Sequence, residues 1–196
     1  MNKFFILLCA ALVTTIFANA QTSSGNMMVG GTLEFSSTSR QGGSFNDGTS
    51  ITFSPSFGYF IQDNLVVGSS LTLSSSRIGT GADKTINSSF GLGPFARYYK
   101  FTSNENFAFF GQAGLSFAFE KTDPSAGGVT KSNSITFSVA PGAAYFFNQH
   151  WAIELAITGF VFRSSDPDTS NNNDKVNTVE LGLSSFSPTF GFRYHF

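Results

Sequence analysis

Five polar side chains stand inside segments that otherwise consist of large apolar and small residues. They are Glu34, Arg97, Gln112, Glu154 and Arg193. In these segments large apolar residues alternate with small or polar ones. Successive side chains of an extended strand point to opposite faces, so the five polar residues lie on the face opposite the large apolar residues. Charged groups removed from water need partners. We therefore predict an internal polar network, with Arg193 near Glu34 and Arg97 near Glu154.

Catalytic and metal-binding groups are scarce in this chain. It has two histidines, His150 and His195, and one cysteine, Cys9. Zinc sites are built mainly from Cys and His, so we expect none. Both histidines fall at the short-turn end of the predicted structure. The end with the longer loops has no histidine, which excludes a Ser–His or Asp–His arrangement at that end. We predict no catalytic residue, no metal site and no cofactor, and hence no enzyme.

One segment has the spacing of a calcium-binding loop, with Asp166, Asp168 and Ser170 at alternate positions. However, Asn171 stands where such a loop requires Gly, and Asn177 stands where it requires Glu. We therefore interpret the segment as a solvated surface loop. The formal net charge of −1 likewise gives no reason to expect a nucleic acid as partner.

The first 20 residues have the parts of a secretory signal peptide. A basic start precedes an uncharged apolar run from Phe4 to Phe17, and Ala18-Asn19-Ala20 matches the small-x-small cleavage pattern. The run is shorter than the ~20 residues that a membrane-spanning helix needs. We predict a signal peptide at 1–20, cleaved after Ala20, and a single cysteine-free domain at 21–196.

Composition and alternation together favour a β-barrel in a membrane. The chain has 25 Phe and only 12% charged residues, whereas soluble domains carry about 25% charged residues. No apolar stretch after residue 20 is long enough for a membrane helix. The alternation predicts an all-β fold, an eight-stranded antiparallel up-and-down transmembrane β-barrel. The predicted strands are 27–38, 50–61, 65–76, 86–101, 107–120, 134–147, 151–163 and 178–196.

The predicted connections alternate between short turns and longer loops. The short turns are 62–64, 102–106 and 148–150, and the longer loops are 39–49, 77–85, 121–133 and 164–177. The longer loops are rich in Gly, Ser, Asn and Asp. In membrane barrels the short turns face the periplasm and the longer loops face the outside, so we expect the same orientation here.

Every second predicted strand carries a related motif around a proline. The prolines are Pro55, Pro94, Pro141 and Pro188. Each motif reads apolar, small, Pro, and then an aromatic residue four positions after the Pro, as expected for a repeated β-hairpin. Because proline cannot donate to the ladder and a closed barrel has no edge, we predict a bulge or a missing ladder bond near each one. A change of phase in the last strand predicts a further bulge near Ser184-Ser185.

The two faces of the predicted strands differ in polarity. The outward face is uncharged, as expected where an Arg or Lys facing lipid at the midplane costs roughly 2–4 kcal/mol. It comprises Leu33, Phe35, Ile51, Phe53, Phe57, Leu65, Val67, Leu71, Leu73, Phe90, Leu92, Phe109, Leu115, Phe117, Ile135, Phe137, Val139, Ile153, Leu155, Ile157 and Val161. Aromatic residues near the short turns are predicted to form an interfacial girdle. They are Tyr59, Tyr98, Tyr99, Tyr145, Trp151 and Tyr194.

Three segments resemble the small outer-membrane β-barrel domains of Gram-negative bacteria, the OmpA/OmpX-like group. They are the hairpin from Ser54 to Gly68, the hairpin from Pro141 to Leu155, and the terminal aromatic strand from Phe190 to Phe196. The resemblance implies a location in the outer membrane and contact with its lipids. It also implies that the barrel-assembly machinery recognises the terminal strand. These motifs are specific for fold and export, not for an activity.

The predicted function is a non-enzymatic, monomeric barrel with a structural role in the envelope or in surface contacts. An eight-stranded barrel is just wide enough for its own side chains, so we expect the polar network to plug the lumen. The alternative is a narrow pore or transport route for small molecules, with the network as its gate. A soluble secreted β-sandwich is disfavoured, because the outward Phe, Leu and Ile would form a large exposed apolar patch.

Overall fold

The computed structural model describes residues 22–38, 48–79, 84–125, 127–167, 175–181 and 189–196. Within these residues all regular structure is β-strand. The strands are β1 (Met27–Thr38), β2 (Gly48–Gln62), β3 (Leu65–Ile78), β4 (Thr85–Phe101), β5 (Phe107–Pro124), β6 (Thr130–Phe146), β7 (Trp151–Ala156), β8 (Phe160–Asp166), β9 (Val176–Leu181) and β10 (Thr189–His195). The predicted signal peptide at 1–20 and the predicted bulge near Ser184-Ser185 lie outside the described residues.

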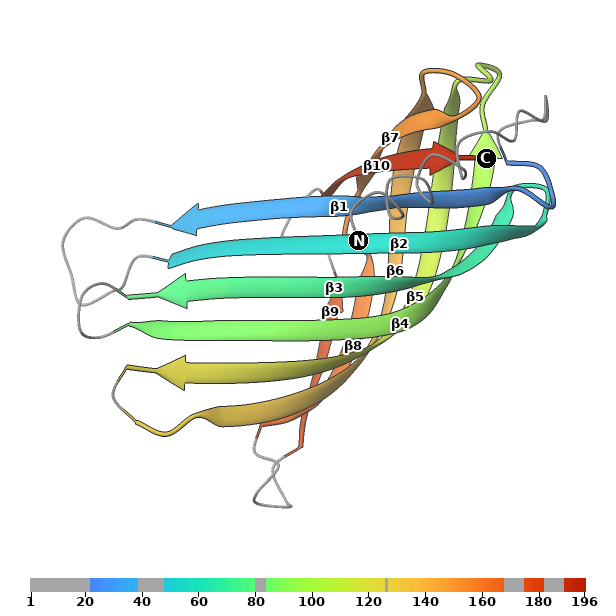
Figure 1. The fold of residues 1–196 in the computed structure, drawn as a ribbon. Coiled ribbons are helices and arrows are strands. Elements are labelled where there is room, and N and C mark those ends of the chain that lie inside the picture. The colour runs from blue at the N-terminus through green and yellow to red at the C-terminus, as the bar shows by residue number, and fades with distance from the viewer. Residues whose placement is uncertain (1–21, 39–47, 80–83, 126, 168–174, 182–188) are drawn as a thin grey trace, which may run out of the picture.

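The strands form one antiparallel sheet that closes on itself (Figure 1). Strands β1 to β6 pair in sequence order, β6 also pairs with β7 and β8, and β10 pairs with both β7 and β1. Thus β7 and β8 are two parts of the seventh predicted strand, and β9 and β10 are two parts of the eighth. The prediction of a closed eight-stranded antiparallel barrel is confirmed.

Several strands run further toward the long-loop end than predicted. Strand β5 continues to Pro124 and β6 begins at Thr130, so the connection between them is shorter than the predicted loop at 121–133. Polar residues pair in these extensions, with Lys121 opposite Lys131. The alternation of apolar and polar residues is weak there, but the backbone hydrogen bonds between the strands continue. The sequence pattern therefore predicted strands that are too short at this end.

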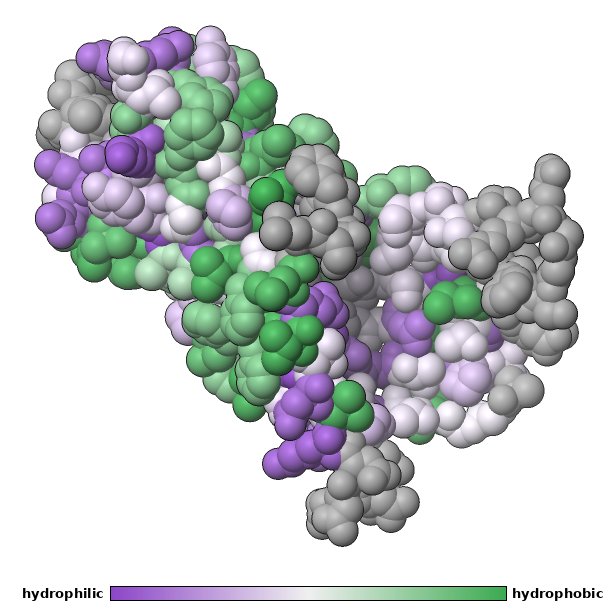
Figure 2. All heavy atoms as spheres, turned by 180° about the vertical axis from the view of Figure 1, so that it is seen from behind, coloured by the Kyte–Doolittle hydropathy of each residue, from purple (hydrophilic) through white to green (hydrophobic). Residues whose placement is uncertain are grey.

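Side chains alternate between an apolar exterior and a mixed interior. Leu33, Phe53 and Phe117 are typical of the outward residues, with exposed fractions of 62%, 48% and 44%. Figure 2 shows apolar side chains, in green, gathered over the strands on this face, with hydrophilic residues, in purple, toward the ends. The outward prediction is wrong at Val161. Phe162 takes the outward position there, because it pairs with the exposed Phe137.

The predicted irregularities at the prolines take two forms. The pairing of β2 with β3 beside Pro55, and of β4 with β5 beside Pro94, is interrupted without a change of register. Beside Pro141 the register itself changes, because the stretch between β7 and β8 holds one extra residue relative to β6. The backbone N–H of Ile157 donates to the carbonyl of Pro141 at this point. The prediction is confirmed at these prolines, and Pro188 lies outside the described residues.

The residues before β1 are tied to the turn between β2 and β3. Asn64 in this turn has a φ of 66°, a left-handed conformation that Asn adopts more readily than most residues. Thr22 Oγ1 lies 2.5 Å from Asn64 Oδ1, and the N–H of Gly25 donates to the carbonyl of Phe60 at 2.9 Å. The segment leading into the first strand is therefore fixed at the short-turn end of the barrel.

Candidate functional site

Glu154 on β7 lies between two arginines inside the barrel. Arg97 Nη1, from β4, is 2.5 Å from Glu154 Oε1, and Arg193 Nε, from β10, is 3.0 Å from Glu154 Oε2. The exposed fractions of Arg97, Glu154 and Arg193 are 3%, 4% and 5%. Each carboxylate oxygen thus has its own guanidinium partner. Such pairing offsets part of the free-energy cost of taking ions out of water.

Gln112 and Tyr99 complete the hydrogen bonding of Arg97. Arg97 donates from Nε and Nη2 to Gln112 Oε1, at 2.9 and 2.6 Å, and from Nη1 to Tyr99 Oη at 2.8 Å. Tyr99 Oη donates in turn to Glu154 Oε1 at 2.9 Å. The Arg97 guanidinium also lies 4.2 Å from the ring centroid of Phe110, a cation–π contact. Arg97 is therefore held in one orientation by several partners.

Arg193 extends the contacts to the opposite side of the closing seam. Its Nη1 donates to Ser56 Oγ on β2 at 2.8 Å. The connected residues come from β2, β4, β5, β7 and β10. We refer to Ser56, Arg97, Tyr99, Gln112, Glu154 and Arg193 together as the lumen cluster. It links strands around the barrel, including pairs that are not neighbours in the sheet.

The structure brings together Arg97, Gln112, Glu154 and Arg193, but not Glu34. Strand pairing sets Gly30 opposite Arg193, and Glu34 lies further toward the long loops. Glu34 is exposed and makes no ion pair within the described part of the chain. The predicted contact between Arg193 and Glu34 is therefore replaced by the contact with Glu154. The predicted proximity of Arg97 and Glu154 is present.

Gly30 makes room for the side chain of Arg193. A Cβ atom at Gly30 would lie 2.7 Å from Arg193 Cδ and closer still to the carbonyl oxygen of Phe192. Real Cβ atoms do not approach other atoms so closely. The lack of a side chain at this position of β1 therefore lets Arg193 cross the seam toward Ser56. Nothing in the sequence pattern distinguishes Gly30 from Gly31 beside it.

Sequence reasoning missed two members of the lumen cluster, Tyr99 and Ser56. The signal for Tyr99 was available, because it follows Arg97 by two positions and so shares its face. The predicted girdle included it, but Tyr99 is fully buried inside the barrel. Ser56 gave no signal, since many small polar residues occupy the inward face.

An apolar layer lies between the lumen cluster and the short turns. Its large, fully buried side chains are Met28, Phe60, Val66, Phe146 and His195, and the ring of Tyr99 from the lumen cluster packs against Phe60 and Phe146. The His195 ring centroid lies 5.8 Å from that of Phe60 and 5.2 Å from that of Phe146. The sequence placed His195 at the rim, but it is buried in this layer because it follows Arg193 by two positions. In this layer the His195 ring lies among the aromatic rings of Phe60, Tyr99 and Phe146.

On the long-loop side of the lumen cluster, the barrel is polar and hollow. A cavity of about 550 Å³, which we call the vestibule, is lined by hydroxyl and amide groups, including those of Thr52, Ser74 and Asn87. Glu120 and Arg163 also line it and lie 3.7 Å apart. Both are about half exposed, so their ion pair contributes little to stability.

The described residues contain no cluster of three or more His, Cys, Asp or Glu that could hold a metal. Of the sequence positions with calcium-loop spacing, Asp168, Ser170 and Asn171 lie outside the described residues. No helix in the described part of the chain is long and apolar enough to cross a membrane. The lumen cluster therefore offers buried charges and hydrogen-bonding groups.

Comparison with known families settles the class of protein. The outer membrane protein beta-barrel domain family matches residues 5–185. The chain belongs to this family. As in other membrane barrels, the short turns are then on the periplasmic side, and the exposed Phe, Leu and Ile face lipid. The protein is located in the outer membrane, while cleavage after Ala20 stays a prediction.

Solved structures agree with the fold of this outer-membrane barrel. Neisserial surface protein A is 20% identical, with a TM-score of 0.50, over 88% of this chain and 98% of its own. Escherichia coli outer membrane protein W is 16% identical, with a TM-score of 0.50, over 89% of this chain and 98% of its own. No curated protein matches the sequence. At these identities the likeness concerns the fold alone.

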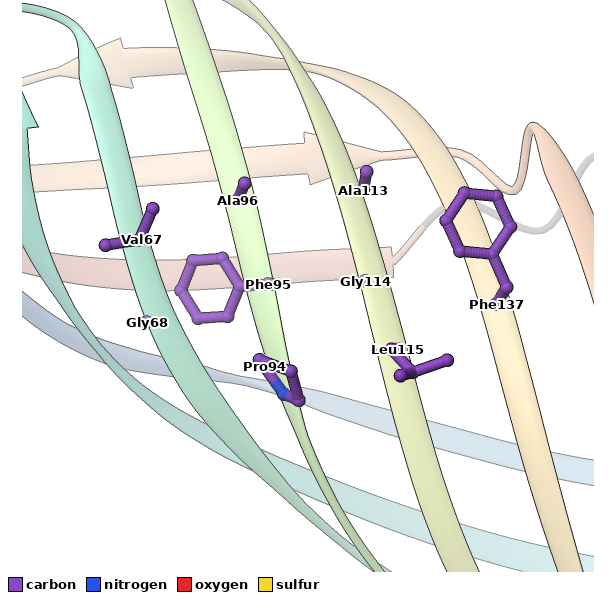
Figure 3. Close-up of a pocket in the computed structure, with 9 residues that line it drawn as sticks. All are labelled: Val67, Gly68, Pro94, Phe95, Ala96, Ala113, Gly114, Leu115 and Phe137. Atoms are coloured by element: carbon purple, nitrogen blue, oxygen red, sulfur yellow. The ribbon is translucent and has the colours of Figure 1, made fainter.

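The lipid side of the outer-membrane barrel has an apolar groove of about 560 Å³. Figure 3 shows Val67, Leu115 and Phe137 around the small residues Ala96 and Ala113. These residues come from neighbouring strands β3 to β6. A groove in this position contacts lipid chains, because the outward face of such barrels lies against the hydrocarbon. It therefore gives no reason to invoke a soluble ligand.

Proposed function

We propose that this outer-membrane barrel is non-enzymatic and closed to solutes, with a structural role in the envelope or in surface contacts. The observation that carries the proposal is that Glu154 contacts Arg97 across the lumen and Arg193 on the neighbouring strand β10. The apolar layer lies directly on the periplasmic side of this contact. The ion pairs and the apolar layer together fill the lumen with side chains, whereas a conducting pore would need water along its whole length.

Opening the lumen would require the lumen cluster to separate. Breaking a buried ion pair by removing one partner costs about 3–5 kcal/mol in soluble proteins. Here one carboxylate serves two guanidinium groups, and Tyr99 and Gln112 bind the same Arg97. A spontaneous open state would thus be rare. This supports a plug more than a freely open channel.

The remaining surface suits contacts with membrane and neighbours. The exposed apolar side chains favour outer-membrane lipids as the permanent partner. The terminal aromatic strand, with Phe190 and Phe192 exposed at 68% and 50%, is suited to recognition by the barrel-assembly machinery during insertion. The proposed barrel is a monomer, and any role at the cell surface would depend on the longer loops.

Liposome swelling tests the closed-barrel proposal. Proteoliposomes carrying the wild-type protein should swell in small sugars no faster than liposomes without protein. A combined Phe60→Ala, Phe146→Ala and Glu154→Ala variant removes parts of both the apolar layer and the lumen cluster, and it should swell faster. Fast swelling with the wild-type protein would contradict closure.

A narrow pore or transport route is the second candidate. The vestibule favours it, because a hollow polar space reaches the barrel interior from the long-loop side. In this case the lumen cluster is a gate. Arg97→Ala or Glu154→Ala would then raise the conductance of a protein that already conducts, whereas Arg163→Ala in the vestibule would not open the gate.

A further inference from the structure

The lumen cluster contains more positive than negative charge. Arg97 and Arg193 are both cationic, since arginine stays protonated in proteins. Within the described residues, Glu154 is the only carboxylate within ion-pair distance of either guanidinium. The other members, Ser56, Tyr99 and Gln112, carry no charge at neutral pH. One buried positive charge therefore lacks a counter-charge from the described protein groups, and buried charges are costly unless paired.

A small cavity adjoins this excess charge. Its volume is about 170 Å³, and Arg97, Gln112, Glu154 and Arg193 all line it. A single water needs only about 10–15 Å³ of such volume, so the cavity has room for a compact ion together with several waters. The cavity is separate from the larger vestibule, whose lining does not include these residues.

The polar groups lining the cavity are mainly donors. Gln112 uses its amide oxygen to accept two hydrogen bonds from Arg97, which leaves its NH₂ group to donate. Arg193 uses Nε and Nη1 for Glu154 and Ser56, which leaves Nη2 as a donor. Thr32 and Thr189, which carry hydroxyl groups, line the same space.

The lining contains one carboxylate, Glu154, and both of its oxygens already accept from the arginines. A cation would meet two guanidinium groups and gain little from Glu154. A neutral solute would leave the charge imbalance unchanged. The chemistry of the cavity is therefore that of a compact anion that accepts hydrogen bonds.

We propose that this cavity binds a small inorganic anion beside Arg193, chloride or a phosphate-sized oxyanion, which balances the charge of the lumen cluster. Arg193 Nη2 and the Gln112 NH₂ group donate to the anion, with Thr32 and Thr189 as further donors. Bound anion stabilises the folded barrel, because it binds the folded form and not the unfolded chain. This inference does not depend on whether the barrel conducts.

Thermal unfolding of the protein in detergent micelles tests the proposal. The ionic strength is kept constant with gluconate, a bulky anion, while chloride or phosphate replaces it. The midpoint temperature should rise saturably with at least one of the two ions, and the ion that acts identifies the occupant. No saturable rise with either ion would overturn the proposal.

Two variants assign the effect to the cavity. Arg193→Gln removes the excess charge, and Gln112→Glu supplies an internal counter-charge of similar size, so the apparent affinity for the anion should fall about tenfold or more in both. Gln112→Glu keeps both arginines paired and tests the proposal even if Arg193→Gln does not fold. Arg77→Gln, at an exposed arginine on β3, is the control and should keep the wild-type response. An unchanged response in Gln112→Glu would also overturn the proposal.

Discussion

Arg97 and Glu154 meet across the barrel although β5 and β6 separate their strands, β4 and β7, in the sheet. Their closest atoms, Arg97 Nη1 and Glu154 Oε1, are 2.5 Å apart, and both side chains are 3% exposed. Strand pairing alone does not create such a contact. It requires two inward-facing residues at the same depth in a barrel narrow enough for their side chains to meet. The contact therefore ties opposite walls of the barrel together.

Replacing Glu154 with Gln should destabilise the barrel strongly. The substitution keeps the size of the side chain but leaves both arginines without a carboxylate, so the free energy of unfolding should fall by about 3–5 kcal/mol. Urea unfolding in detergent or lipid measures the change. Glu120→Gln in the vestibule is the control and should cost less than about 1 kcal/mol, because its ion pair is half exposed. Equal effects of the two substitutions would contradict the role given to Glu154.

Tyr99→Phe removes the hydroxyl that links Arg97 to Glu154. Because this hydroxyl makes hydrogen bonds to charged groups, its loss should lower the free energy of unfolding by about 1.5–3 kcal/mol. Tyr98→Phe is a matched control on the preceding residue, which is 55% exposed on the outward face. It should unfold at nearly the wild-type urea concentration. A larger effect at Tyr98 than at Tyr99 would show that the hydroxyl inside the barrel contributes little.

Gly30→Ala should disturb the crossing of Arg193 over the seam. The added Cβ would clash with the Arg193 side chain and with the backbone of Phe192, so we expect a loss of about 1–3 kcal/mol in unfolding free energy. Gly111→Ala is the control, because a Cβ there meets no atom within 4 Å. The two variants differ only in position. Wild-type stability of Gly30→Ala would mean that Arg193 has another route to Ser56.

Leu92→Arg tests the lipid-facing surface. Leu92 is 47% exposed on the outward face, and an arginine facing lipid should cost about 2–4 kcal/mol if it lies near the midplane. Ser74→Arg points into the polar vestibule instead and should be tolerated better. Equilibrium unfolding of the two variants in phospholipid vesicles gives the comparison. If Ser74→Arg were the less stable variant, the assignment of the outward face to lipid would be wrong.

The barrel could be predicted because its signal is local and repeated. Alternation in each strand sets the two faces, and the short turns set the connections. The strand from Met27 to Thr38 was predicted with its observed bounds. Prediction failed where pairing, rather than side-chain pattern, decides the structure. The extra residue between β7 and β8 moved Phe162 outward in place of Val161, and no pattern in that segment indicates it.

The candidate site could be predicted only in part, because depth and register act at long range. Arg97 and Glu154 lie at a similar depth in the barrel, and this depth could be predicted from the number of residues that separates each of them from its short turn. The partner of Arg193 depends on how β1 and β10 are aligned, and this alignment places Gly30 rather than Glu34 beside it. The cavity beside Arg193 depends on side-chain packing around the whole lumen, which no single strand encodes.

Single-channel recording in planar lipid bilayers tests most directly whether the lumen cluster and the apolar layer close the barrel. Reconstituted wild-type protein should give no steady current at moderate voltage, because the ion pairs of Arg97, Glu154 and Arg193 stay intact on the long-loop side of the apolar layer. Glu154→Ala, recorded in parallel, should give currents more often than the wild-type protein does, while Glu120→Ala should not. Steady single-channel currents from the wild-type protein would contradict closure and favour the pore.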